Sequence, residues 1–223
     1  MKIVMISDLH GTLPDTVPEC DVLTIAGDVS PCYGRYPYHK IWMKDNFNHW
    51  LKDQPARNIV GVAGNHDEAL MDDDFANSLH WDYLKDSSVI IDHVKFYGHP
   101  WTKLFCDWYF QLDDISLAVK NNMIPDDTDV LITHGPPYGV LDVVQGVDVM
   151  VRGRRESEYL GDKSLKRRVN ELPNLKLHTF GHIHSSHGVR PPTVLSEHNT
   201  TFVNAAVLDE RYQPGYKVIE MEI

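Results

Sequence analysis

Five short polar clusters along the chain carry carboxylate, amide and imidazole side chains, and none of them contains cysteine. In chain order they read "SDLHG", "GDVS", "GNHDE", "HGPP" and "GHIH". Oxygen and nitrogen donors without sulfur suit divalent ions such as Mn, Fe or Zn and give no reason to expect a soft metal. Taken together, the clusters predict a divalent-metal site.

Each cluster taken singly also has an ordinary structural explanation. A DxH triplet is commonly a turn with a helix N-cap, Gly-Asp is a frequent turn dipeptide, and Asn and Gly are turn formers. "HGPP" would serve as a rigid loop, and the histidines of "GHIH" could face solvent. The metal hypothesis therefore rests on the ordered set and on where each cluster falls.

Each cluster directly follows a short apolar run of the kind that forms a buried strand. The runs are "KIVMI" (2–6), "VLTIA" (22–26), "NIVGVA" (58–63), "DVLIT" (129–133) and "LHTF" (177–180). Ligands of open α/β sheets bind beyond the carboxyl ends of the strands. Five strands are therefore expected to bring their polar clusters to the same end of the fold.

Helical patterns alternate with these strands and indicate an α/β fold with a largely parallel sheet. Two apolar stripes have helical spacing: Met43, Phe47, Trp50 and Leu51, then Leu165, Val169 and Leu172. Residues 87–98 instead predict a hairpin, and "TTFVNAA" and "GYKVIEMEI" add strands without intervening helices. We expect a second, partly antiparallel sheet packed on the first, within a single domain spanning 1–223.

Composition narrows the functional classes. The chain has 223 residues, is 42% hydrophobic, and has no signal-peptide pattern or apolar run of the ~20 residues that span a bilayer. Its three cysteines form no CxxC pair, which predicts a reducing, cytoplasmic setting. A net charge of -11 argues against binding of extended nucleic acid, so attraction for a small phosphate ester must be local. The sequence has no heptad pattern that would indicate an oligomer, and it leaves the oligomeric state open.

The ordered set "DLH…GD…GNHDE…HGPP…GHIH" resembles the calcineurin-like metallophosphoesterase superfamily over residues 4–205. The segments "YGHPWTKLFCDWYFQL", "LITHGPPYGVLD" and "LHTFGHIHSSHG…FVNAA" are similar to the small metallophosphoesterase-domain subfamily, which includes brain cyclic-nucleotide phosphodiesterases. This resemblance implies a four-layer α/β/β/α sandwich of two mixed sheets. It also implies hydrolysis of a phosphoester with two divalent metal ions.

The resemblance also implies a role for individual residues. One ion would be held by Asp8, His10, Asp28 and His184. Asp28 would bridge to the second ion, which Asn65, His134 and His182 would complete. His66 would be the catalytic residue that protonates the leaving oxygen. The expected reaction is attack on phosphorus by a metal-bridging hydroxide, with Mn favoured over Fe or Zn for activity.

Some positions depart from the subfamily pattern. His182 stands where some mammalian members have glycine, so the second ion should be held more firmly here. "GNHD" replaces the usual "GNHE", which we interpret as a change behind the metal ligands. Weaker candidates for substrate binding are His99, Trp101 and Arg152. A buried structural histidine, a core aromatic and a solvated loop are the respective alternatives.

The predicted substrate is a small phosphodiester such as a cyclic nucleotide. A phosphomonoesterase or protein phosphatase is the alternative, because the same core supports both chemistries and fold does not decide substrate. A nuclease is disfavoured by the acidic charge. A non-catalytic scaffold is disfavoured because all seven ligand positions and His66 are filled.

Overall fold

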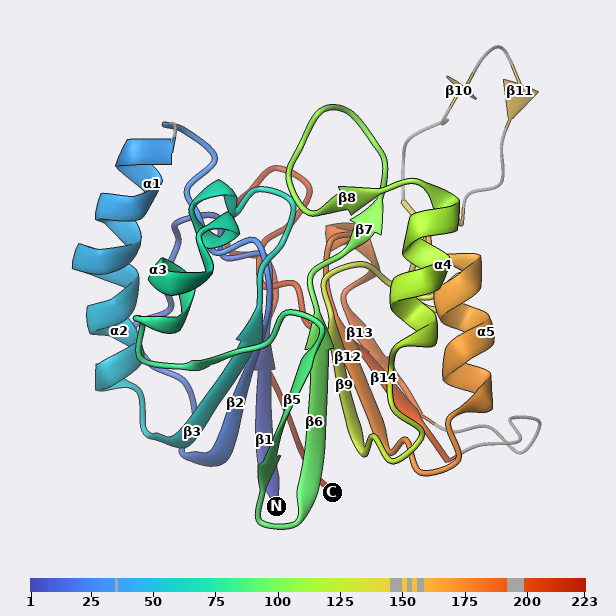
Figure 1. Ribbon diagram of the computed structural model, residues 1–223. Coiled ribbons are helices and arrows are strands. Elements are labelled where there is room, and N and C mark those ends of the chain that lie inside the picture. The colour runs from blue at the N-terminus through green and yellow to red at the C-terminus, as the bar shows by residue number, and fades with distance from the viewer. Residues whose placement is uncertain (35, 145–149, 152–153, 156–158, 192–198) are drawn as a thin grey trace.

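The computed structural model describes residues 1–223 except 35, 145–149, 152–153, 156–158 and 192–198 (Figure 1). Two large sheets lie face to face at its centre, and helices cover the outer face of each (Figure 1). The four-layer α/β/β/α sandwich predicted from the sequence is therefore confirmed.

The first sheet has five strands in the described part of the chain. In spatial order these are β15 (Ile219–Glu222), β1 (Lys2–Ile6), β2 (Cys20–Ala26), β3 (Ala56–Val62) and β4 (Asp82–Tyr83). The four strands from β1 to β4 are parallel, and β15 joins the edge antiparallel to β1. Parallel order places the carboxyl ends of β1, β2 and β3 side by side.

The second sheet has six described strands and is partly antiparallel, as expected. Their order is β13 (Gly188–Arg190), β14 (Thr201–Asn204), β12 (Leu177–Phe180), β9 (Val130–Thr133), β6 (Val94–His99) and β5 (Ser87–Ile91). The hairpin predicted over 87–98 is the β5–β6 pair. The two C-terminal segments separate, because β14 lies parallel to β12 while β15 crosses to the first sheet.

Two short ribbons and the helices complete the fold. The ribbons pair β7 (Thr102–Lys103) with β8 (Gln111–Leu112), and β10 (Met150–Val151) with β11 (Arg154–Arg155). The helices are α1 (Tyr36–Trp42), the π-helical turn η1 (Met43–Phe47), α2 (Asn48–Asp53), the 3₁₀ turn η2 (Glu68–Met71), α3 (Asp73–Asn77), α4 (Asp114–Asn122), α5 (Lys163–Glu171) and the 3₁₀ turn η3 (His184–Ser186). Within the described ranges, no helix has the length and apolar character required to span a membrane.

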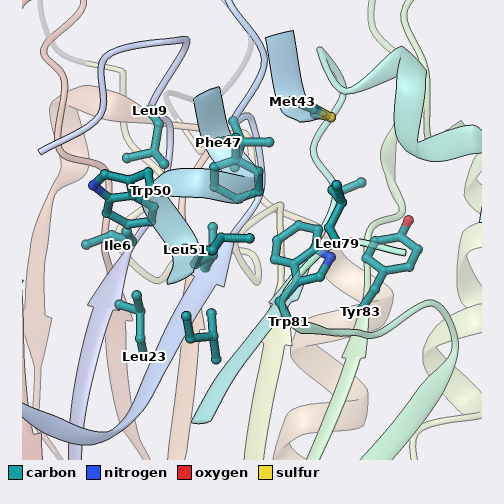
Figure 2. Close-up of a cluster of buried hydrophobic side chains, with 14 of the residues drawn as sticks. Ile6, Leu9, Leu23, Met43, Phe47, Trp50, Leu51, Leu79, Trp81 and Tyr83 are labelled. Atoms are coloured by element: carbon teal, nitrogen blue, oxygen red, sulfur yellow. The ribbon is translucent and has the colours of Figure 1, made fainter. Parts of the chain in front are cut away.

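Burial on both faces explains why the strands are continuous apolar runs. In β1, Ile3 and Met5 pack between the two sheets, while Val4 and Ile6 face the helices of the first sheet. The helix-side core contains the predicted Met43 stripe, in which Phe47 stacks on Trp50 and packs edge-on against Trp81 (Figure 2). On the other side of the molecule, the Leu165 stripe of α5 covers the second sheet. The sheets are therefore rigidly packed platforms for the loops at their ends.

Candidate metal centre

The five polar clusters come together where the two sheets meet. Ser7 follows β1 and forms a parallel bridge to Ala206, which follows β14. The carboxyl end of a strand in the first sheet is thereby joined to the carboxyl end of a strand in the second. The amide of Gly181 donates a hydrogen bond to the carbonyl of His134, 3.0 Å away. The amide of His182 donates to both carboxylate oxygens of Asp8, at 3.1 and 3.0 Å. The predicted convergence of strand ends is thus present in the structure.

Asp8, His10 and His184 form the first group of candidate metal ligands. One donor atom from each lies within 4.8 Å of the others, and all three residues are buried. His184 Nε2 is 3.3 Å from Asp8 Oδ1. Neither ring nitrogen of His10 has a hydrogen-bond partner among the described residues, although both are buried. A buried imidazole without a partner is costly unless something binds it, so the site fits a cation.

Asp28, His134 and His182 form the second group, also with donor atoms within 4.8 Å of one another. His134 Nε2 lies 3.3 Å from Asp28 Oδ2 and 3.0 Å from Asn65 Oδ1. The same Asp28 oxygen is 3.6 Å from His10 Nε2 in the first group. Asp28 therefore contacts an imidazole of each group, at the position where the sequence predicts a bridging carboxylate.

Backbone carbonyls orient two of the imidazoles. His134 Nδ1 is 2.8 Å from the carbonyl of Ala26, and His184 Nδ1 is 2.9 Å from the carbonyl of Asp209. In the neutral form of the ring, which a bound cation would require, a hydrogen bond at Nδ1 fixes the tautomer in which Nε2 carries the free lone pair. In both residues, Nε2 is the atom that faces the carboxylates.

The charges of the site compensate one another. Burial by itself would raise the pKa of the Asp8 carboxyl, but the imidazole of His184 beside it outweighs this effect and holds the pKa at about 2. Burial opposes protonation of His134, yet the Asp28 carboxylate raises the pKa of His134 to about 9. Burial lowers the pKa of His10 to about 4. His10 is therefore neutral near pH 7 and offers a lone pair to a metal ion.

Several of these residues have left-handed backbone conformations. The φ angles are 57° at Asp8, 42° at His10, 52° at Asp28 and 68° at His182. Such angles cost on the order of 1–3 kcal/mol per residue and persist where the surrounding structure imposes them. Here the amides of Asp8 and His10 bond the carbonyls of Gly27 and Asp28 across the first sheet. The loops are thus held in a conformation that turns the donors inward.

Glycines allow the clusters to approach closely. A Cβ on Gly64 would meet the carboxylate and backbone of Asp28, and one on Gly181 would meet the Asp8 carboxylate and the Ser7 hydroxyl. A side chain at either position would push a carboxylate out of place. The glycine that precedes Asn65 and the glycine that precedes His182 are therefore part of the site.

His66 lies beside the two groups without belonging to either. Its side chain is partly exposed, and its ring is 5.0 Å from the His10 ring and 4.7 Å from the ring of Trp108. Its backbone amide donates to Asp28 Oδ1 at 2.8 Å. His66 thus lies next to the candidate ligands and remains partly exposed to solvent.

The weaker substrate-binding candidates have different positions. His99 is fully buried and bonded through Nε2 to Asn121 Oδ1 at 3.1 Å, which fits the alternative of a structural histidine. Trp101 lines a small cavity with His182, but its indole N–H is bonded to Asp86. Arg152 lies outside the described residues.

Two further residues lie near the candidate ligands; the sequence pointed to the first only as a change behind the ligands and to the second not at all. Asp67 is buried and accepts hydrogen bonds from the amides of Val29, Ser30 and Gly64, so it holds two of the clusters together. It is the aspartate of "GNHD", where only an indirect change was expected. Tyr212 packs edge-on against the His10 ring, 4.8 Å away. Nothing in "DERYQPG" distinguishes Tyr212 from an ordinary turn residue.

Two packed sheets with paired clusters of oxygen and nitrogen donors at their joined ends are the arrangement expected of a protein that binds two metal ions. Residues 1–186 match the family model described as calcineurin-like phosphoesterase, and the chain belongs to this family. Members of this family are dinuclear metal enzymes that hydrolyse phosphoesters. The site described above is in keeping with that chemistry, because it offers two groups of candidate ligands.

The chain is also similar to curated proteins over most of its length. Metallophosphoesterase domain-containing protein 1 of Homo sapiens is 32% identical over 241 residues, which cover 96% of this chain and 68% of the relative. A UPF0046 protein of Caenorhabditis elegans is 34% identical over 224 residues, which cover 92% of this chain and 69% of the relative. Metal-dependent hydrolysis of a phosphoester is accordingly the activity class of this chain.

Proposed function

We propose that this protein hydrolyses a small phosphodiester, with cyclic nucleotides as the first candidates. The observation that carries the proposal is the pair of three-residue donor groups, each within 4.8 Å, with Asp28 in contact with both. In this proposal Asp8, His10, His184 and Asp28 hold one ion, and Asp28, Asn65, His134 and His182 hold the other. Asn65 would contribute its side-chain amide oxygen, which lies 3.0 Å from His134 Nε2.

Two divalent ions supply Lewis-acid activation of water and neutralise charge on the phosphoryl oxygens. We propose Mn²⁺ as the activating ion. The donor set contains carboxylate, amide and imidazole but no thiolate, which suits Mn, Fe or Zn and not a soft metal. The protein contributes a preformed set of donors, because left-handed loops, glycine contacts and carbonyl-oriented imidazoles hold them in place.

His66 is the proposed source of the proton for the leaving oxygen. Its ring is positioned between His10 and Trp108, and its backbone is fixed by Asp28. An alkoxide leaving from a diester needs a proton far more than a nitrophenolate does, so a positioned imidazole favours alkyl diesters as substrates.

A substrate panel tests the proposal. Protein supplied with Mn²⁺ is assayed on bis-p-nitrophenyl phosphate, p-nitrophenyl phosphate, 2′,3′- and 3′,5′-cyclic nucleotides and a single-stranded oligonucleotide. We expect the highest kcat/KM on a small diester and little activity on the oligonucleotide, because the net charge is -11. A preference for the monoester would contradict the diesterase proposal. Inactivity on the whole panel with two ions bound would favour a binding role.

We further propose that the protein is cytoplasmic and works as a single domain on a small phosphate ester, without a membrane partner. Cys20, Cys32 and Cys106 are all free in the structure, which is consistent with a reducing compartment. Fractionation of cells that express the tagged protein tests the location. Recovery in a membrane or secreted fraction would overturn it.

A further inference from the structure

Tyr212 lies over the first group of candidate ligands. Its ring is 4.8 Å from the His10 ring at an interplanar angle of 85°, and 5.4 Å from the His184 ring at 80°. The side chain remains 44% exposed, so it forms a boundary between the donors and solvent. Tyr212 thus faces the site from the first group, whereas Trp108 borders it on the His66 side.

The turn that carries Tyr212 is built around Asp209. The Asp209 side chain accepts the amides of Arg211 at 2.8 Å and Gln213 at 3.0 Å, on either side of Tyr212. The Asp209 carbonyl accepts the Tyr212 amide and also pairs with His184 Nδ1, both at 2.9 Å. One carbonyl therefore fixes both a candidate ligand and the tyrosine beside it.

The backbone of Tyr212 is left-handed, with a φ of 58°. Non-glycine residues adopt this region rarely, and an aromatic residue there marks a position that the surrounding turn enforces. In this structure the other left-handed residues include Asp8, His10 and His182, which also face the site. The strained conformation points the tyrosine ring at the donors instead of into solvent.

Among the described residues, the Tyr212 hydroxyl makes no hydrogen bond to the protein, and its ring lies against the candidate ligands His10 and His184. An ordinary tyrosine phenol has a pKa of about 10. The phenol therefore keeps its proton at neutral pH. A protonated phenol is a hydrogen-bond donor, and an anionic phosphoryl oxygen is a strong acceptor for it.

We infer that Tyr212 contacts the substrate and that its phenolic O–H donates a hydrogen bond to a phosphoryl oxygen of the bound ester. This inference rests on the proposed function. It assigns to Tyr212 the recognition of phosphoryl charge, separate from the proton transfer assigned to His66. A ring that only covers the donors would need no hydroxyl. Removing the hydroxyl oxygen therefore distinguishes a covering role from a hydrogen-bonding role.

The test compares Tyr212→Phe with Tyr216→Phe in the full chain loaded with Mn²⁺. Tyr216 is a matched control because it belongs to the same C-terminal segment, but its ring stacks on His187 at 4.5 Å. Each variant is measured for kcat/KM on the best diester and for binding of inorganic phosphate by calorimetry. Metal content and melting temperature confirm that the site is intact.

We expect Tyr212→Phe to lower kcat/KM by about 10- to 100-fold, the effect of losing a hydrogen bond to a charged group. Phosphate binding should weaken in the same variant, while two ions stay bound. Tyr216→Phe should match the wild type in every measurement. If Tyr212→Phe also matches the wild type, the inferred hydrogen bond is absent and the ring only covers the donors.

Phosphate binding keeps this test separate from the proposed function. If the wild-type protein with two ions hydrolyses no ester, the proposed function fails, but phosphate binding still reports on Tyr212. Weaker phosphate binding by Tyr212→Phe alone would then support the contact. Equal binding by the wild type and both variants would overturn it.

Discussion

His184 Nε2 lies 3.3 Å from Asp8 Oδ1, although Asp8 follows β1 of the first sheet and His184 follows β12 of the second sheet. The amide of His182 donates to the same carboxylate. The first group of candidate ligands therefore exists only when the two sheets are packed together. A cation bound there would link the sheets as well as take part in chemistry.

Chelation of metal ions is expected to destabilise the fold for this reason. An ion present at 100 times its Kd stabilises the native state by about 2.7 kcal/mol, which corresponds to about 5–10 °C in melting temperature for a chain of this size. EDTA should lower the melting temperature of the Mn²⁺-loaded protein by at least this amount, and Mn²⁺ should restore it. Calorimetric scans that show no shift would mean that the sheets are not linked through an ion.

Replacement of His66 by asparagine should impair turnover without removing metal. The loss of a general acid costs about 10²- to 10⁴-fold, and the cost depends on how much the leaving group needs a proton. The kcat of His66→Asn should therefore fall strongly on a cyclic nucleotide and much less on bis-p-nitrophenyl phosphate. Equal losses on both substrates, with two ions bound, would contradict the role as an acid.

The histidines of "GHIHSSH" should respond differently to substitution. His182 belongs to the second donor group, so His182→Gln should weaken binding of one ion by more than about 100-fold, beyond the usual effect of changing a residue behind a ligand. His187 stacks on Tyr216 and belongs to neither group, so His187→Gln is the control and should bind two ions. Metal content after dialysis measures both. Loss of an ion from the His187 variant would show that the groups are assigned incorrectly.

Alanine at Gly64 should disrupt the site through a steric contact. The added Cβ would meet the Asp28 carboxylate and backbone, and overpacking of this kind costs about 1–3 kcal/mol. Gly64→Ala should lose metal and activity together. Gly139→Ala is the control, because Gly139 has a φ of 74° but open space around its Cβ. The control should lose about 1–2 kcal/mol of stability in urea unfolding, yet retain both ions.

Much of the candidate site could be predicted because its signals are local. An apolar run that stops at Asp, Asn, His and Gly encodes both a buried strand and a turn, and these residues tolerate the left-handed backbone seen at Asp8 and His182. The helical stripes beginning at Met43 and Leu165 are likewise short-range patterns, and both are buried where expected.

Other features depend on packing between distant segments. His99 follows the same apolar pattern whether it points to a phosphate or into the core, and only the α4 residue Asn121 behind it decides the matter. The C-terminal strand β15 has no local signal for the sheet that it joins, and it pairs with β1. Tyr212 reaches His10 because the Asp209 turn is held against His184.

The sequence by itself determined the donor types, their order and the strands that carry them, because these follow from side-chain chemistry and periodicity. Only the tertiary structure decided which donors stand together, with Asp28 in contact with both groups and Tyr212 and Trp108 at its edges. The physical reason is that a metal centre requires atoms a few ångströms apart. Such proximity between β1 and β12 comes from the burial of apolar side chains between two sheets, which no local pattern specifies.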